Sequence, residues 1–184
     1  EAYRSIWNEE LDESPLRTVT RSQAEKLAER LQARHPEIVV DWAMRYGNPS
    51  IQSVLERLAE QGCNRIAFMA LYPQYAAPTT ATAYDKAFEA LTKMRWQPAI
   101  RTMGPYHDEP GYIDLLAKSV ERHLATLDFE PEKLIMSYHG VPKRFLMSGD
   151  PYPCMCHKTT RLVRERLGWP EDRVMVCFQS RFGP

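Results

Sequence analysis

The sequence predicts an α/β fold in which mainly parallel strands are covered by helices on both faces. Short apolar runs rich in branched and aromatic residues recur along the chain, and a longer amphipathic stretch follows almost every one. Strands that alternate strictly with helices form right-handed crossover units, which build a doubly wound parallel sheet. The chain has 184 residues, 43% hydrophobic and 26% charged, a composition typical of a soluble globular protein.

The first three elements are predicted near the start of the chain. Ser22 and Glu25 form a capping box, and the apolar residues that follow share one helical face until His35 and the proline after it. The run IVVDWAMRY at 38–46 predicts a buried strand. A second helix is predicted after the turn GNPS, with Gly62 as its C-terminal cap.

The same alternation continues to the end of the chain. Pro110 marks the start of a helix, and Gly168 marks the end of another. The remaining strands are predicted at 65–72, 99–103, 133–138 and 173–178, and the helices between them at 79–94, 109–127 and 154–167. In total, five strands alternate with five helices.

A domain boundary is predicted at Gly104-Pro105, a candidate linker ahead of a long helix. It divides the chain into residues 1–104 and 105–184, each part of one α/β domain. Glu1 is not an initiator methionine, and Pro184 follows FQSRFG without a closing helix. We therefore expect these residues to be a piece of a longer protein.

Charge and cysteine usage exclude several classes of function. The 24 basic and 24 acidic residues cancel, which argues against a nucleic-acid partner. No run approaches the roughly 18 apolar residues of a membrane-spanning helix, and the first residues are too polar for a signal peptide. The 4 irregularly spaced cysteines favour free thiols in a reducing compartment. We expect a cytoplasmic protein.

The residues that follow each predicted strand are the candidates for chemistry, because open parallel sheets bind ligands beyond the carboxyl ends of their strands. Aromatic and basic side chains and one histidine occupy these positions: Arg45-Tyr46, Tyr72-Pro73-Gln74-Tyr75, His139-Gly140-Val141-Pro142 and Gln179-Ser180-Arg181. Aromatic faces stack on planar rings and arginine binds carboxylates, so this rim favours a flat anionic ligand. No glycine-rich phosphate loop follows a predicted strand, which argues against a nucleotide.

Several segments together resemble the ferrochelatase family. SYHGVPKRF with GDPYP, the threonine pair after Cys156 and the ending FQSRFGP resemble the signature region of bacterial members. LYPQYAAPTTATAYD at 71–85 resembles their other hallmark segment, and YRSIWNEELDESPL and MRYGNPSI match in pattern and order. The resemblance covers essentially the whole chain. It implies a chelatase fold of two similar Rossmann-like halves around a porphyrin cleft, both halves being incomplete in this chain.

The resemblance implies a lyase that inserts Fe²⁺ into protoporphyrin IX to form protoheme, the last step of heme biosynthesis. His139 matches the family's active-site histidine, as catalytic residue and as metal ligand. Imidazole binds divalent iron and also accepts protons near neutral pH, so both roles stay open. Arg45 and Tyr72 resemble residues that line the porphyrin cleft, and Tyr75 is close by, so these three are the predicted porphyrin contacts.

The resemblance also implies an acidic partner for His139, a glutamate in a segment beyond residue 184. The first strand and helix of the family are absent from this chain as well. We therefore expect the 184 residues alone to be inactive or a poor chelatase. Ferrous iron is a substrate in this reaction, and we expect neither a prosthetic group nor an iron–sulfur cluster in this chain.

Structural interpretations compete with several of these assignments. A lone histidine at a strand end is more often structural than catalytic, and Arg45 and Tyr72 have equally ordinary interpretations as ion-pairing and packing residues. Cys154-Met155-Cys156-His157 lacks the spacing of a zinc site and opens a predicted helix, so packing is favoured. GDPYP is predicted to be a rigid turn.

The basic run on the helix at 154–167 is predicted to be a solvated face, with contact to a membrane surface as a minor alternative. Its members are Lys158, Arg161, Arg164 and Arg166.

Two further functions stay open from the sequence. One is a non-catalytic tetrapyrrole- or metal-binding protein of the same architecture. The other is a chelatase for a different tetrapyrrole, in the coproporphyrin or cobalt branch. The spellings SYHG and FQSRFG resemble protoporphyrin-type bacterial enzymes, which favours the protoporphyrin assignment.

Overall fold

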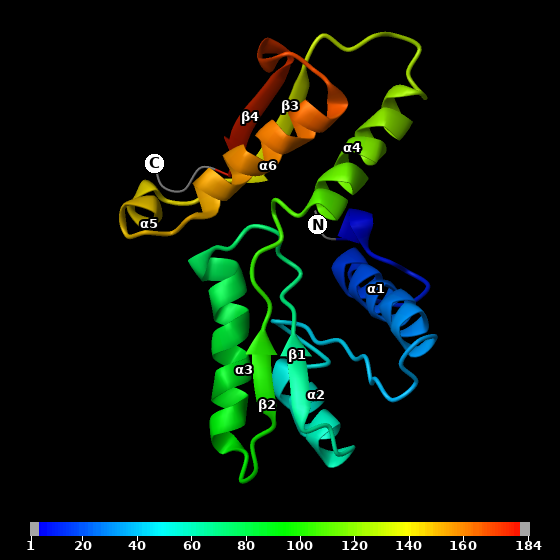
Figure 1. Ribbon diagram of the computed structural model, residues 1–184, viewed down its shortest axis with the longest axis vertical. Coiled ribbons are helices and arrows are strands. Elements are labelled where there is room, and N and C mark those ends of the chain that lie inside the picture. Colours follow the sequence, from blue (N-terminus) through cyan, green and yellow to red (C-terminus); the bar gives the residue numbers. More distant parts are fainter. Residues whose placement is uncertain (1–3, 181–184) are drawn as a thin grey trace. The chain divides into compact units, whose positions relative to one another are not determined.

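The computed structural model describes residues 4–180 and divides into two compact units (Figure 1). The first contains the chain up to Phe68 together with Thr82–Thr102, and the second contains Met69–Ala81 and the chain from Met103 onward. Helices alternate with parallel strands in both units, so the predicted α/β class is confirmed. The chain passes between the units three times, and the boundary at residue 104 stays a prediction.

The first unit is built on a two-stranded parallel sheet. In chain order its elements are η1 (Arg4–Ile6), α1 (Pro15–Gln32), α2 (Ile51–Glu60), β1 (Arg65–Phe68), α3 (Thr82–Lys93) and β2 (Ala99–Thr102). β1 and β2 pair from Arg65 opposite Ala99 to Phe68 opposite Thr102. Helices α2 and α3 pack against each other, and their apolar faces form the core: Ile51, Val54, Leu55, Ala83, Ala87, Ala90 and Leu91.

Helix α1 begins earlier than the capping box predicts. The Ser14 hydroxyl accepts a hydrogen bond from the Arg17 N–H at 3.3 Å, and Pro15 occupies the first turn. Ser22 therefore lies inside the helix rather than at its start. Past the end of α2, Gly62 adopts φ +85°, a conformation that favours glycine, as its predicted role as a cap requires.

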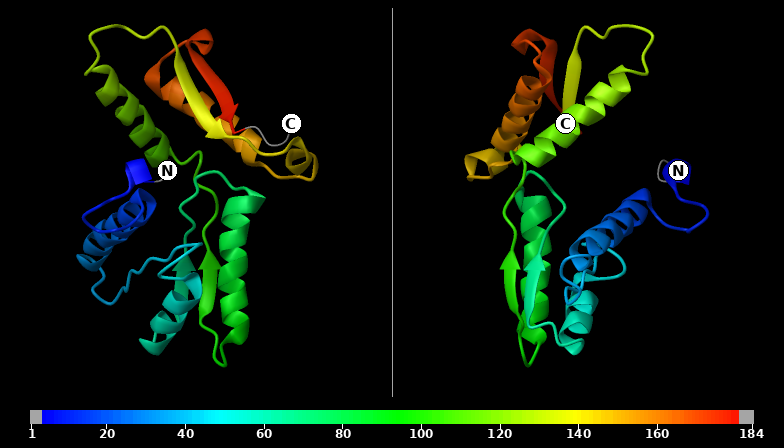
Figure 2. Two further views of the ribbon diagram at one scale, coloured as in Figure 1. Left: turned by 180° about the vertical axis from the view of Figure 1, so that it is seen from behind. Right: turned by 45° about the vertical axis from the view of Figure 1, so that its right-hand side comes forward.

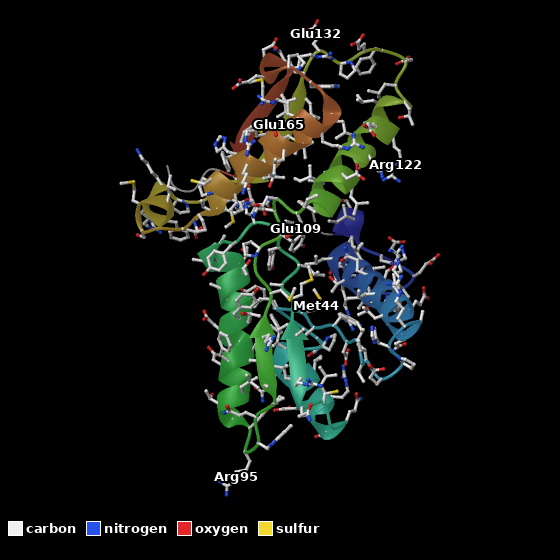
Figure 3. All side chains as sticks on the ribbon, in the orientation of Figure 1. Met44, Arg95, Glu109, Arg122, Glu132 and Glu165 are labelled. Carbon is white, nitrogen blue, oxygen red and sulfur yellow. The ribbon has the colours of Figure 1, made fainter. Side chains whose placement is uncertain are left out.

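The strand predicted at 38–46 does not form. Met44, labelled in Figure 3, makes only an isolated bridge with Ser50, across a tight local turn. The described chain supplies no partner strand for this segment, and a strand needs a neighbour to satisfy its amides. Its side chains bind the flanking helices instead, with Asp41 paired to Arg57 at 2.6 Å and Trp42 under the Arg17 guanidinium.

The strand predicted at 65–72 ends early, at Phe68. Its partner β2 ends at Thr102, opposite Phe68, so no further ladder is available to the residues that follow. From Met69 the chain belongs to the second unit and returns to the first only at α3. Tyr72 and Tyr75 therefore lie in a connecting segment of the second unit, not at a strand end.

The second unit contains a second parallel pair of strands. Its elements are the π-helical turn η2 (Ala77–Ala81), α4 (Pro110–Leu124), β3 (Leu134–His139), α5 (Lys143–Met147), α6 (Tyr152–Leu167), η3 (Glu171–Arg173) and β4 (Val174–Gln179). The short helix α5 was not predicted. Helix α6 packs against α4 and against the sheet, and the buried residues of the two helices are Ile113, Ala117, Cys156, Thr159, Thr160 and Val163.

Helix α6 covers one face of the β3–β4 sheet, and the opposite face of that sheet is seen from behind in Figure 2. Alternate residues of β3 point to the two faces. The Tyr138 hydroxyl bonds the Thr160 hydroxyl of α6 at 2.9 Å, which places Tyr138 on the covered face. Ile135, with 60% of its surface exposed, and His139 therefore lie on the other face.

One buried histidine of the second unit is separate from the sheet edge. His107 is 7% exposed, and its carbonyl accepts a hydrogen bond from the Thr159 hydroxyl at 2.9 Å. Its Nδ1 lies 3.6 Å from Asp108 Oδ1 and makes no hydrogen bond within the described residues. Burial lowers the pKa of His107, with Lys158 acting in the same direction and Asp108 against it.

We predict that His107 destabilises the fold in mild acid. Because its pKa is lower in the folded than in the unfolded chain, its unfolded form binds the proton more readily. The stability that neutral His107 contributes is fully present above the unfolded pKa of about 6.5. It is lost as the pH falls below that value, at up to about 1.4 kcal/mol of unfolding free energy per pH unit. Urea unfolding should be measured between pH 7.5 and 5.5. The free energy of unfolding should depend less steeply on pH in His107→Gln than in the parent.

The exposed His123 on α4 gives the matched control, and His123→Gln should keep the parent's slope. An unchanged slope in His107→Gln would contradict the prediction.

Candidate functional site

Strand β3 presents His139 at its carboxyl end. His139 lies opposite Gln179 of β4 and is exposed. Its Nδ1 lies 2.8 Å from the carbonyl oxygen of Gly140. A carbonyl can only accept, so Nδ1 carries the proton and Nε2 carries the ring's lone pair. In this tautomer Nε2 can bind a metal ion or accept a proton, the two roles that the sequence left open.

Gly140 extends the pairing of β3 and β4 beyond His139. Its N–H donates to the Gln179 carbonyl at 2.6 Å, and the two backbones approach closely there. A Cβ atom at residue 140 would lie 2.8 Å from the Gln179 oxygen and 3.3 Å from the Ser180 oxygen. Only glycine fits without a backbone shift. Arg181, also predicted at this rim, lies outside the described residues.

Helix α6 carries a polar cluster close to the end of β3. The Tyr152 side chain, in the first turn of α6, lies near the Cys156 thiol and the main chain of His139. Burial raises the pKa of Tyr138 to about 12 and that of the Cys156 thiol to about 11, and it also raises the pKa of Tyr152. These groups are therefore neutral near pH 7 and act as hydrogen-bonding groups rather than as ions.

The segment that carries Tyr72 and Tyr75 is attached to the same helix. The Tyr75 N–H contacts Met155 Sδ at 3.3 Å, and the Gln74 side chain donates to the Thr159 hydroxyl at 3.0 Å. Tyr72 is 38% exposed and Tyr75 is half-buried. The structure thus places both predicted tyrosines in the unit that contains His139, on a segment attached to α6.

Arg45 belongs to the first unit. Its Nε donates to the Thr82 hydroxyl at the start of α3 at 3.1 Å, and its guanidinium lies 4.4 Å from the centre of the Tyr46 ring. These contacts orient the guanidinium plane. The binding role predicted for Arg45 stays a prediction, as do the roles of His139, Tyr72 and Tyr75.

Asp150 and Tyr152 were missed as site residues, because GDPYP reads as a turn. Asp150 is 8% exposed, and its two carboxylate oxygens accept hydrogen bonds from two different segments. Oδ1 accepts the Tyr152 N–H at 3.0 Å, and Oδ2 accepts the Ala77 N–H at 2.8 Å. The bond to Tyr152 is local and could be expected from an aspartate just before a helix. The bond to Ala77 has no sequence signal.

The Cys154–His157 run does not converge on one point. Cys156 is fully buried against Tyr152, whereas Cys154 and His157 are exposed. Within residues 4–180, no group of three or more His, Cys, Asp or Glu side chains is placed to hold a metal ion. All four cysteines are free thiols.

The basic residues of α6 form ion pairs with acids of the same unit. Glu165, labelled in Figure 3, accepts from Arg161 at 2.9 Å, and Arg166 reaches Asp114 of α4 at 2.7 Å. Lys158 pairs with Asp108. This pattern is that of a solvated face. Among the described helices, none combines the length and the apolar character that crossing a membrane requires.

The fold and this edge define an α/β protein with an exposed histidine at the carboxyl end of a parallel strand. The sequence profile of the Ferrochelatase family matches residues 1–184. The chain therefore belongs to the ferrochelatase family, as the motifs around His139 predicted.

Similar proteins from several bacteria carry the same name. The chain is 63% identical over 183 residues to the ferrochelatase of Rhizobium meliloti (strain 1021), covering 100% of this chain and 54% of that protein. It is 62% identical over 183 residues to the ferrochelatase of Agrobacterium fabrum (strain C58 / ATCC 33970), covering 100% and 53%. For Brucella abortus (strain S19) the identity is 61% over 182 residues, covering 99% and 51%. The chain thus spans about half the length of the curated relatives it matches.

We predict that Gly140→Ala displaces the end of β3. The added Cβ would lie 2.8 Å from a backbone oxygen, so the strand ends must separate, at a cost of about 1–3 kcal/mol. Denaturant unfolding of the full-length protein should show this loss. Gly111→Ala is the control, because a Cβ there meets nothing within 4 Å and the free energy of unfolding should stay the same or rise. Equal stabilities for the two variants would contradict the prediction.

Proposed function

We propose that the full-length protein is a protoporphyrin ferrochelatase, which inserts Fe²⁺ into protoporphyrin IX to give protoheme. The observation that carries this proposal is the place of His139, an exposed histidine at the carboxyl end of β3 whose Nδ1–H donates to the Gly140 carbonyl. Membership of the ferrochelatase family supports the same activity. Ferrous iron is a substrate in this proposal, and no resident cofactor is invoked.

The chemistry asks two things of a protein group near the macrocycle. Two pyrrole N–H protons leave as Fe²⁺ forms bonds to the four nitrogens, so the net products are protoheme and two protons. A neutral imidazole can accept one proton at a time and release it to water, and it can also ligate the incoming iron. Nε2 of His139 is suited to either act, because Nδ1 is already committed as a donor.

We propose Tyr72, Tyr75 and Arg45 as contacts of the porphyrin. Aromatic rings stack on the macrocycle, and a guanidinium binds propionate carboxylates through paired hydrogen bonds. The exposed surface of Tyr72 and the orientation of the Arg45 guanidinium by Thr82 support these roles. We place the reaction in the cytoplasm, which the four free thiols support.

We predict that His139→Ala lowers kcat for iron insertion by about 10²- to 10⁴-fold, the usual contribution of a positioned acid–base group. The measurement is anaerobic insertion of Fe²⁺ into protoporphyrin IX by the full-length protein, followed by the loss of porphyrin fluorescence. His123→Ala, which removes an exposed histidine of α4, should keep the parent's rate.

The outcomes separate the alternative functions. A parent protein that binds porphyrin but never metalates it would support the non-catalytic binding protein. Faster metalation of coproporphyrin than of protoporphyrin would identify coproporphyrin as the substrate. Full turnover in His139→Ala would overturn the role of His139.

A further inference from the structure

The segment Met69–Ala81 is attached to the second unit through the start of α6, through Asp150, and through a hydrogen bond from the Tyr106 N–H to the Pro73 carbonyl at 3.1 Å. It leaves β1 of the first unit, makes its contacts in the second, and returns to the first at α3. Tyr75 and Gln74 contact Met155 and Thr159 in the first two turns of α6. These contacts involve a thioether and neutral side chains, which make weaker hydrogen bonds than a charged group does.

The contact made by Asp150 is different in kind. Its carboxylate is more than nine-tenths buried and is shared between two backbone amides, those of Ala77 and Tyr152. Hydrogen bonds from an N–H to a buried carboxylate are among the stronger ones in proteins. One side chain therefore fixes the end of the tyrosine-bearing segment to the first residue of α6.

The same first residue of α6 also lies near the histidine. The Tyr152 side chain is close to the main chain of His139, so Asp150 and Tyr152 connect Ala77 with the surroundings of the end of β3. His139 has further support that does not depend on Asp150. Strand pairing with β4 and the bond of Tyr138 to Thr160 hold the end of β3 in place.

We propose that Asp150 is a positioning residue for porphyrin binding, which sets the place of Tyr72 and Tyr75 relative to His139. This inference rests on the proposed function and adds a residue to it. Because β3 is held independently, loss of the Asp150 bonds moves the aromatic segment more than it moves His139. The consequence is a change in KM for the porphyrin with a much smaller change in kcat.

Asp150→Asn tests this with little change in shape. Asparagine has one acceptor oxygen in place of two, so one of the two amides must face an NH₂ group that cannot accept. In the full-length protein we expect KM for protoporphyrin to rise about tenfold and kcat to change by less than about threefold. The circular dichroism spectrum should match that of the parent at the assay temperature.

Asp108→Asn is the matched control. Asp108 also links a loop of the second unit to α6, through a partly exposed pair with Lys158, and its loss should leave KM unchanged. If Asp150→Asn keeps the parent's KM, or loses kcat alone as a partly unfolded enzyme would, the proposal is overturned.

Hydrogen exchange of the parent protein gives a second test that needs no variant. The Ala77 and Tyr152 amides should exchange slowly, because both donate to a buried carboxylate. Rapid exchange at Ala77 would overturn the proposal even if Asp150→Asn failed to fold. This measurement does not depend on the proposed function. A parent protein that metalates no porphyrin would refute the chelatase assignment. The exchange rate of the Ala77 amide would still decide whether Asp150 holds the segment.

Discussion

The parallel pairing of β3 with β4 is the constraint on which the candidate site depends. Its ladder runs to His139 opposite Gln179 and is continued by the Gly140 N–H, so the backbone around the histidine is held on one side by strand pairing. The turn that follows brings the Gly140 carbonyl within reach of the imidazole and fixes its tautomer. Pleating places the ring on the face away from α6. One pairing register therefore determines the β3–β4 ladder, the tautomer of His139 and the exposure of its ring.

Helix α6 links this edge to the rest of the second unit. Its buried face is unusually polar for a core, with Cys156, Thr159 and Thr160 in place of large apolar side chains. Each of these residues contacts a different neighbour: Tyr152, the Gln74 side chain and the Tyr138 hydroxyl. Because hydrogen bonds are directional, these polar contacts fix β3 and the segment Met69–Ala81 at defined places on the helix. Apolar packing alone does this less specifically.

The elements that the sequence predicts well are those with local causes. Glycine past a helix end at Gly62 and Gly168, and periodic apolar faces in α2, α4 and α6, place most helices and three strands of the structure close to prediction. The failures have causes distant in sequence. Residues 38–46 have strand composition but no partner strand in the described chain, and β1 stops where β2 does. Likewise His139 is found from its motif, whereas the bond from Ala77 to Asp150 joins residues that no local pattern relates.

The path of the chain between the units bears on how such a protein can evolve. Segment Met69–Ala81 is encoded between two elements of the first unit, yet its contacts belong to the second. A recombination event that exchanged everything before residue 104 would bring in a new Met69–Ala81 segment. That segment would pack against an α6 that had evolved with a different one. Asp150, Met155 and Thr159 would then face backbone and side chains they had not been matched to. The two parts of the second unit are therefore expected to diverge together, with substitutions in 69–81 accompanied by substitutions in α6.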